Sequence, residues 1–144
     1  MKLETTGGQT FSLRDLKGQA AVLYFYPRDN TPGCTKEGLD FSAQHAAFKK
    51  LKVQVFGISN DILSSHEKFL GKHAFTFPLV SDPEKELSQE FGVIKMKSMY
   101  GKQFEGIERS TFFLDEEGKI EKEWRKVKVP GHVAEVLAYA RSRA

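Results

Sequence analysis

The chain has 144 residues, enough for one domain with its own core, and we expect a single domain over residues 1–144. Its 22 basic and 19 acidic residues are interspersed, so the net charge of +3 excludes the concentrated basic surface typical of nucleic-acid binding. A single cysteine excludes an internal disulfide, and no apolar run approaches the ~18 residues of a membrane span. The sequence therefore predicts a cytoplasmic protein without nucleic-acid or membrane partners.

The first elements in chain order are short. Residues 3–5 and 10–13 flank Gly7-Gly8 and predict an N-terminal β-hairpin. Residues 13–18 predict one helical turn that ends at a glycine. These elements lead into the main body of the fold.

Strands and helices then alternate. We predict strands at 20–26, 53–59 and 78–80, and helices at 35–50, 62–72 and 84–91. Such alternation indicates parallel strands joined by helices. An antiparallel hairpin at 110–115 and 119–125 and an amphipathic helix at 132–143 complete the chain. This order resembles that of thioredoxin-like proteins, an α/β fold with a central mixed sheet flanked by helices.

The only cysteine, Cys34, follows the apolar strand at 20–26 and lies where a helix begins. At a helix N-terminus, unpaired backbone N–H groups and the helix dipole favour a thiolate over a thiol. The alternative is a buried structural cysteine, which is common among free cysteines. A structural cysteine would usually lie inside the strand, whereas Cys34 follows a loop and has Thr31, Thr35 and Lys36 as neighbours. The position therefore favours a reactive thiol.

The loop before Cys34 matches a known pattern. Pro27, Thr31 and Cys34 have the spacing P-x-x-x-T-x-x-C of the peroxiredoxin active-site loop. The longer run from Phe25 to Glu37 resembles the peroxiredoxin Q branch, also called the bacterioferritin comigratory protein group. Further similar blocks follow in order: Gly57-Ile58-Ser59, residues 77–82, Phe91-Gly92-Val93, Tyr100-Gly101-Lys102 and residues 109–112. Chains of this group usually have a further N-terminal stretch, so we expect one edge of the domain to be less well covered.

The resemblance implies a thiol peroxidase that reduces hydrogen peroxide and alkyl hydroperoxides through a sulfenic acid at Cys34. It implies that the Thr31 hydroxyl and the backbone N–H groups of Gly33 and Cys34 hold the peroxide. Pro27 would shape the loop through its fixed φ and would take no part in the chemistry. We expect no metal and no cofactor, because the sequence has neither a metal-ligand spacing nor a Gly-rich phosphate loop.

The remaining part of the expected site is a cation. Attack of sulfur on an O–O bond requires donors that hold the oxygens more strongly as charge shifts toward them. The resemblance aligns Arg109 with the arginine that the active-site loop recruits from a distant strand. Arg28, which is much nearer to Cys34 in the sequence, is the alternative.

The chain lacks a second cysteine that could resolve a sulfenic acid. Many relatives have such a cysteine five residues after the first or on the next helix, whereas this chain has Leu39 at the first place and Ser64, Phe69, Leu70 and Gly71 near the second. We therefore expect a one-cysteine mechanism with an external thiol: glutathione, glutaredoxin, thioredoxin or Cys34 of a second subunit. The chain also lacks the insert and tail of the dimeric branch, which indicates a monomer.

Two other functions are alternatives, and the positions of the histidines argue against the first. A cysteine hydrolase would need a histidine beside Cys34 as a base. The four histidines lie elsewhere, on predicted helices or at their ends: His45, His66, His73 and His132. A thioredoxin-like binding or holdase module without turnover would not need Cys34, Thr31 and Arg109 as a set.

The lining of the substrate entrance is a further prediction. Five apolar residues could cover the loop and admit an alkyl hydroperoxide: Phe25, Met96, Met99, Tyr100 and Phe104. The alternative is that they are ordinary core residues, as aromatic and methionine side chains more often are.

Overall fold

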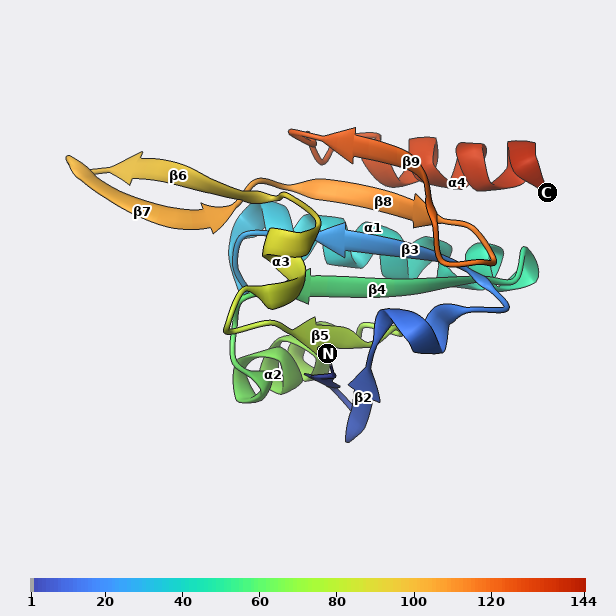
Figure 1. The fold of residues 1–144 in the computed structure, drawn as a ribbon, viewed down its shortest axis with the longest axis horizontal. Coiled ribbons are helices and arrows are strands. Elements are labelled where there is room, and N and C mark those ends of the chain that lie inside the picture. Colours follow the sequence, from blue (N-terminus) through green and yellow to red (C-terminus); the bar gives the residue numbers. More distant parts are fainter. Residues whose placement is uncertain (1) are drawn as a thin grey trace.

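The computed structural model describes residues 2–144, and a seven-stranded mixed sheet forms its centre (Figure 1). The strand order across the sheet is β2-β1-β5-β4-β3-β8-β9. In chain order these strands are β1 (Leu3–Thr5), β2 (Gln9–Phe11), β3 (Ala20–Phe25), β4 (Val53–Ser59), β5 (Leu79–Ser81), β8 (Ser110–Leu114) and β9 (Ile120–Arg125). β3, β4 and β5 are parallel, and the N-terminal hairpin and the β8–β9 hairpin pair antiparallel at the two sides.

Helices cover both faces of the sheet. They are η1 (Leu13–Leu16), α1 (Pro32–Lys50), α2 (Leu63–His73), α3 (Glu86–Glu90) and α4 (His132–Arg143). Side chains of β3 alternate between two core clusters, because successive residues of a strand point to opposite faces. One cluster contains Tyr24 and residues of α1, α2 and α4, and the other contains Phe25 and residues of η1 and α3. β3 is therefore buried on both faces, as its apolar sequence predicts.

A second, two-stranded sheet stands apart from the central one. Its strands are β6 (Ile94–Met99) and β7 (Lys102–Ile107), which pair antiparallel. Figure 1 shows this hairpin extending beyond the end of the main sheet, and Tyr100 at its tip is 97 % exposed. This hairpin was not predicted from the sequence, because its strands are mostly exposed and lack the buried apolar face of a core strand.

The architecture confirms the predicted thioredoxin-like fold with a central mixed sheet, flanking helices and an N-terminal β-hairpin. The terminal helix has the predicted bounds, and most other elements differ from prediction by one or two residues. The main correction is α1, which begins at Pro32 and not at residue 35. Proline is favoured in the first turn of a helix because its missing N–H would have no helical partner there. No helix in residues 2–144 is long and apolar enough to cross a bilayer.

Candidate active site

Cys34 lies in the first turn of α1 and is 1 % exposed. The first backbone hydrogen bond of the helix runs from Thr35 N–H to the Thr31 carbonyl. The N–H groups of Gly33 and Cys34 precede that bond, so the helix itself gives them no acceptor. The Thr31 side chain does not cap the helix, because its hydroxyl donates to the Arg28 carbonyl at 2.9 Å. The helix therefore begins with backbone donors, at Cys34 and at the residue before it, that have no acceptor inside the helix.

Arg109 reaches Cys34 across 75 positions of sequence. Its Nη2 donates to Cys34 Sγ at 3.3 Å. Arg109 directly precedes β8, and the first residue of that strand, Ser110, pairs with Phe25 at the end of β3. Because the active-site loop starts at the same end of β3, the strand register brings the guanidinium to the cysteine. Arg28, the alternative cation, is exposed and makes no hydrogen bond to Cys34 within residues 2–144.

Gly33 allows Arg109 to come this close. A Cβ atom at position 33 would lie 3.1 Å from Arg109 Nη2. That distance is shorter than an ordinary van der Waals contact, so a larger residue would push the guanidinium away from its place. The absence of a side chain at Gly33 therefore lets the Arg109 guanidinium lie beside the start of α1.

Glu37 is a further member of the site, and it was not predicted from the sequence. Arg109 Nη1 donates to Glu37 Oε1 at 2.6 Å, and the other oxygen, Oε2, has no hydrogen-bond partner within residues 2–144. Burial raises the pKa of Glu37 to about 7, although the guanidinium of Arg109 acts in the opposite direction. Glu37 follows Cys34 by three positions, and residues at this spacing share one face of a helix. That spacing was the signal available in the sequence.

A cavity of about 430 Å³ lies between the active-site loop and the β6–β7 hairpin. Pro27 and Thr31 line it from the loop, and Met99 and Phe104 line it from the hairpin. Two of the five predicted entrance residues therefore face this cavity. The other three do not line it: Phe25 is buried in the sheet core, and Met96 and Tyr100 are exposed on the hairpin.

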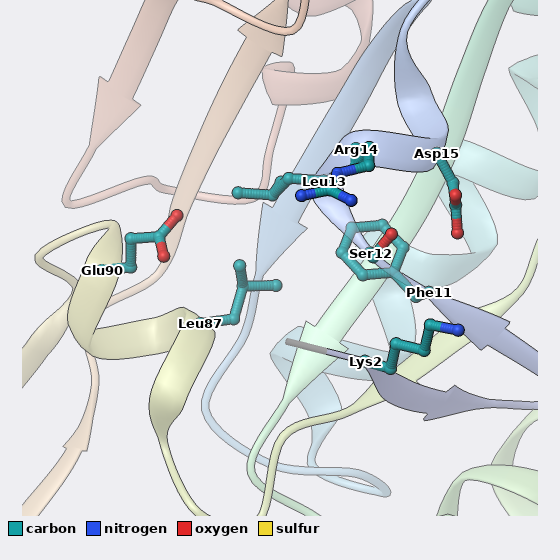
Figure 2. A pocket seen from close by; sticks show the side chains of 8 residues that line it. All are labelled: Lys2, Phe11, Ser12, Leu13, Arg14, Asp15, Leu87 and Glu90. Atoms are coloured by element: carbon teal, nitrogen blue, oxygen red, sulfur yellow. The ribbon is translucent and has the colours of Figure 1, made fainter.

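Another cavity, of about 470 Å³, lies away from the cysteine. Figure 2 shows that residues of η1, such as Arg14, and residues of α3, such as Leu87 and Glu90, face it. None of the predicted site residues lines this cavity. Its size alone therefore does not indicate a reactive site.

The histidines lie away from the sulfur atom. His45 shares a hydrogen bond of 2.8 Å with Thr76, and His132 shares one of 2.8 Å with Thr111. His73 stacks on Phe75 at the end of α2. No histidine ring within residues 2–144 contacts Cys34, so the structure offers no base for a cysteine hydrolase.

His66 belongs to a buried network below the active-site loop. Its Nε2 lies 2.9 Å from the Val80 carbonyl, and its Nδ1 lies 2.8 Å from Asp29 Oδ2. Burial alone would raise the pKa of Asp29, but hydrogen bonds from His66, Tyr26 and Ser65 lower it below its usual value. Both ring nitrogens of His66 therefore lie beside oxygen atoms, which holds the ring between the active-site loop and β5.

The same network contains a group of potential metal ligands. Ligand atoms of Asp29, Asp61 and His66 lie within 4.8 Å of one another. Both ring nitrogens of His66 already have hydrogen-bond partners, and Asp61 already accepts hydrogen bonds from Ser59 and from the Asp29 N–H. We interpret the group as a hydrogen-bonded support for the loop.

Comparisons with known proteins identify the family of the chain. The AhpC/TSA family model matches residues 1–123. The chain is 50 % identical to peroxiredoxin Bcp of Xanthomonas campestris pv. campestris over 144 residues, which cover 100 % of this chain and 90 % of the relative. It is 49 % identical to peroxiredoxin Bcp of Bacillus subtilis over 137 residues, covering 95 % and 87 % of the two chains.

A solved structure leads to the same family. The bacterioferritin comigratory protein of X. campestris, described for its alkyl peroxide reduction activity from trapped intermediate and ligand complexes, superposes with a TM-score of 0.94. The sequence identity is 49 %, and the match covers 99 % of this chain and 91 % of that one. Sequence, fold and the surroundings of Cys34 thus agree, and the chain belongs to the AhpC/TSA family of peroxiredoxins.

Proposed function

We propose that this protein is a thiol-dependent peroxidase that reduces hydrogen peroxide and alkyl hydroperoxides through a sulfenic acid at Cys34. The observation that carries the proposal is the 3.3 Å contact between Arg109 Nη2 and Cys34 Sγ. A guanidinium at this distance stabilises the negative charge of a thiolate and stays in place as that charge moves onto a peroxide. A cysteine that served only for packing would not need this partner.

The first step transfers one oxygen atom to sulfur. The Cys34 thiolate attacks the nearer peroxide oxygen, the S–O bond forms as the O–O bond breaks, and the departing oxygen takes a proton to leave as water or an alcohol. The N–H groups of Gly33 and Cys34 and the Arg109 guanidinium are the donors for this event. The Thr31 hydroxyl joins them when it turns away from the Arg28 carbonyl, to which it donates in this structure. Each well-aimed donor contributes on the order of 3 kcal/mol to such a transition state. Pro27 limits access of water from the loop side.

The second stage requires a thiol from outside the chain, since Cys34 is the only cysteine. The external thiol attacks the sulfenic sulfur, water leaves, and a mixed disulfide forms. A second thiol then attacks that disulfide and restores the Cys34 thiolate. Glutathione, glutaredoxin and thioredoxin remain the candidate reductants, and a monomer in the cytoplasm remains the predicted state.

A non-catalytic binding or holdase module is less well supported. Binding alone would not require a partly buried guanidinium that contacts both a thiol and a carboxyl group. The exposed apolar side chains of the β6–β7 hairpin, Met96, Met99 and Tyr100, are the feature that would favour it.

Oxidation of the reduced protein by one equivalent of hydrogen peroxide tests the proposal. We expect loss of the Cys34 thiol in stopped flow many orders of magnitude faster than for a small thiolate, and a sulfenic acid trapped at Cys34 in the mass spectrum. Cys34→Ser, which keeps the size of the side chain, should abolish the reaction without changing the unfolding transition. A parent rate equal to that of a free thiol would refute the peroxidase and favour the binding module.

A further inference from the structure

The charges at the reacting sulfur are not balanced by Arg109 alone. One guanidinium contacts two acidic groups, the Cys34 thiol and the Glu37 carboxyl group. As a thiolate attacks a peroxide, its negative charge moves away from sulfur and onto the departing oxygen. Pro27 and Thr31 of the active-site loop line the cavity, so a peroxide that enters through it would have its departing oxygen on the cavity side of the sulfur. A second cation inside the cavity would therefore complement the transition state.

Lys97 of β6 lines this cavity together with Thr31, and so do two other cations, Arg28 and Lys85. Lys97 is the one that belongs to the β6–β7 hairpin, whose end leads to Arg109. Its side chain lies across the partner strand, because a Cβ atom at Gly106 would lie 3.1 Å from Lys97 Cδ and 3.3 Å from Lys97 Cε. Gly106 is three residues before Arg109 in the chain. The lack of a side chain at Gly106 thus leaves room for the lysine stem to run toward the end of the hairpin that leads into the active site.

The surroundings of Lys97 agree with a place near the reacting sulfur. Its pKa is lowered, first by burial and then by the positive charge of Arg109, while Cys34 and Glu108 act in the opposite direction. This agrees with the geometry, in which Lys97 and Thr31 line the same cavity and the Lys97 stem passes over Gly106. Lys97 is half-buried and forms no ion pair within residues 2–144, so its charge is free to meet a substrate.

We propose that Lys97 is the second cation of the peroxide site and stabilises the negative charge on the oxygen that departs from Cys34. The inference rests on the proposed peroxidase function. In the step concerned, the S–O bond forms and the O–O bond breaks, and the electron pair of the O–O bond stays on the departing oxygen. The Lys97 ammonium holds this oxyanion until it takes a proton and leaves as water or an alcohol. Arg109 and Lys97 thus act on the two ends of the same charge transfer.

Stopped-flow oxidation of Cys34 by hydrogen peroxide, tert-butyl hydroperoxide and cumene hydroperoxide tests this assignment. We expect Lys97→Met to slow each reaction by about tenfold, a modest loss for a half-exposed charge, and Lys97→Arg to keep most of the rate. The loss should be larger for the peroxide whose departing alcohol is less acidic, because that oxygen carries more charge. A purely structural role would not produce this dependence on the departing group.

Lys95→Met is the matched control, since Lys95 is an exposed lysine on the same face of β6 and does not line the cavity. Alkylation of Cys34 by iodoacetamide, which releases no oxyanion, should be equally fast in the parent and in Lys97→Met. Equal peroxide rates for the Lys97 and Lys95 variants would overturn the inference, and so would equal slowing of peroxide reaction and alkylation. A slow parent enzyme would instead refute the peroxidase function itself.

Discussion

Two pairs of ionisable side chains adjoin the active-site loop, His66–Asp29 and Arg109–Glu37, and they differ in how completely they are hydrogen-bonded. In the first, His66 and Asp29 have partners for every polar atom that faces the interior. In the second, Arg109 bonds only one oxygen of Glu37, Oε2 has no partner among residues 2–144, and the guanidinium also contacts Cys34. A fully bonded pair stabilises the structure, whereas a buried oxygen without a partner calls for an explanation, and a role in the reaction at Cys34 is one.

The His66–Asp29 pair supports the active-site loop, whereas the Arg109–Glu37 pair adjoins the reactive sulfur. Asp29 belongs to the loop between β3 and α1, and His66 ties it to α2 and to the Val80 carbonyl in β5. Arg109 is tied to α1 through Glu37 and faces the sulfur atom. Substitutions in the first pair should therefore change stability most, and substitutions in the second should change the reaction with peroxide most.

The largest effect on stability is expected from His66→Ala. The change leaves the buried Asp29 carboxylate without one of its hydrogen-bond partners and opens a cavity, so it should lower the free energy of unfolding by about 2–4 kcal/mol. Urea denaturation measures the loss, with Lys68→Ala on the exposed face of α2 as the control. A loss below about 1 kcal/mol, the size typical of an exposed pair, would show that the His66–Asp29 pair does not support the loop.

The largest effect on chemistry is expected from Arg109→Met. Loss of the guanidinium removes a donor to Cys34 and should slow oxidation by hydrogen peroxide roughly 100-fold or more. Stopped flow measures the rate, and Arg14→Met, an exposed arginine far from the site, should react like the parent. If Arg109→Met also reacted like the parent, Arg28 would become the better candidate for the cation.

Glu37 makes stability depend on pH in a defined direction. Its pKa rises from 4.5 in the unfolded chain to about 7 in the folded protein, so the folded state binds the proton more tightly. The contribution of the group to stability is full below about pH 4.5 and is lost as pH rises through about 7, by on the order of 3 kcal/mol. Glu37→Gln should therefore gain stability relative to the parent over this range.

Urea denaturation between pH 4.5 and 8 checks this expectation. The difference between Glu37→Gln and the parent should grow with pH, while Glu84→Gln, at an exposed position, should give a constant difference. A constant difference for Glu37→Gln as well would mean that the carboxyl group titrates alike in the folded and unfolded chains.

The smallest effect is expected from Gly33→Ala. The new Cβ atom would lie 3.1 Å from Arg109 Nη2 and should shift the guanidinium by a few tenths of an ångström, which slows peroxide oxidation by about three- to tenfold. Gly71→Ala is the matched control, because a Cβ atom at this position of α2 meets no atom within 4 Å. That control should keep the rate and gain up to about 1 kcal/mol of helix stability. An unchanged rate for Gly33→Ala would show that the position of Arg109 is not tightly constrained.

Much of the fold follows from local sequence patterns. The apolar run of β3 and the amphipathic pattern of α4 appear at nearly their predicted bounds, because the periodicity of buried residues follows from the geometry of strand and helix. The start of α1 is different, since Pro32 and Gly33 read as loop residues although proline also suits the first turn of a helix. The β6–β7 hairpin escaped prediction because few of its side chains are buried.

The sequence by itself determined the nucleophile, the loop around it and the need for an external thiol, because Cys34 is the only cysteine and its neighbours are local. Arg109 was named through family resemblance, and no local pattern pointed to it. Only the tertiary structure decided that the register of β3 against β8 brings Arg109 to Cys34, that Glu37 shares its guanidinium, and that Lys97 crosses Gly106 into the cavity. Charge pairs of this kind join residues far apart in the chain, and strand pairing sets their distances.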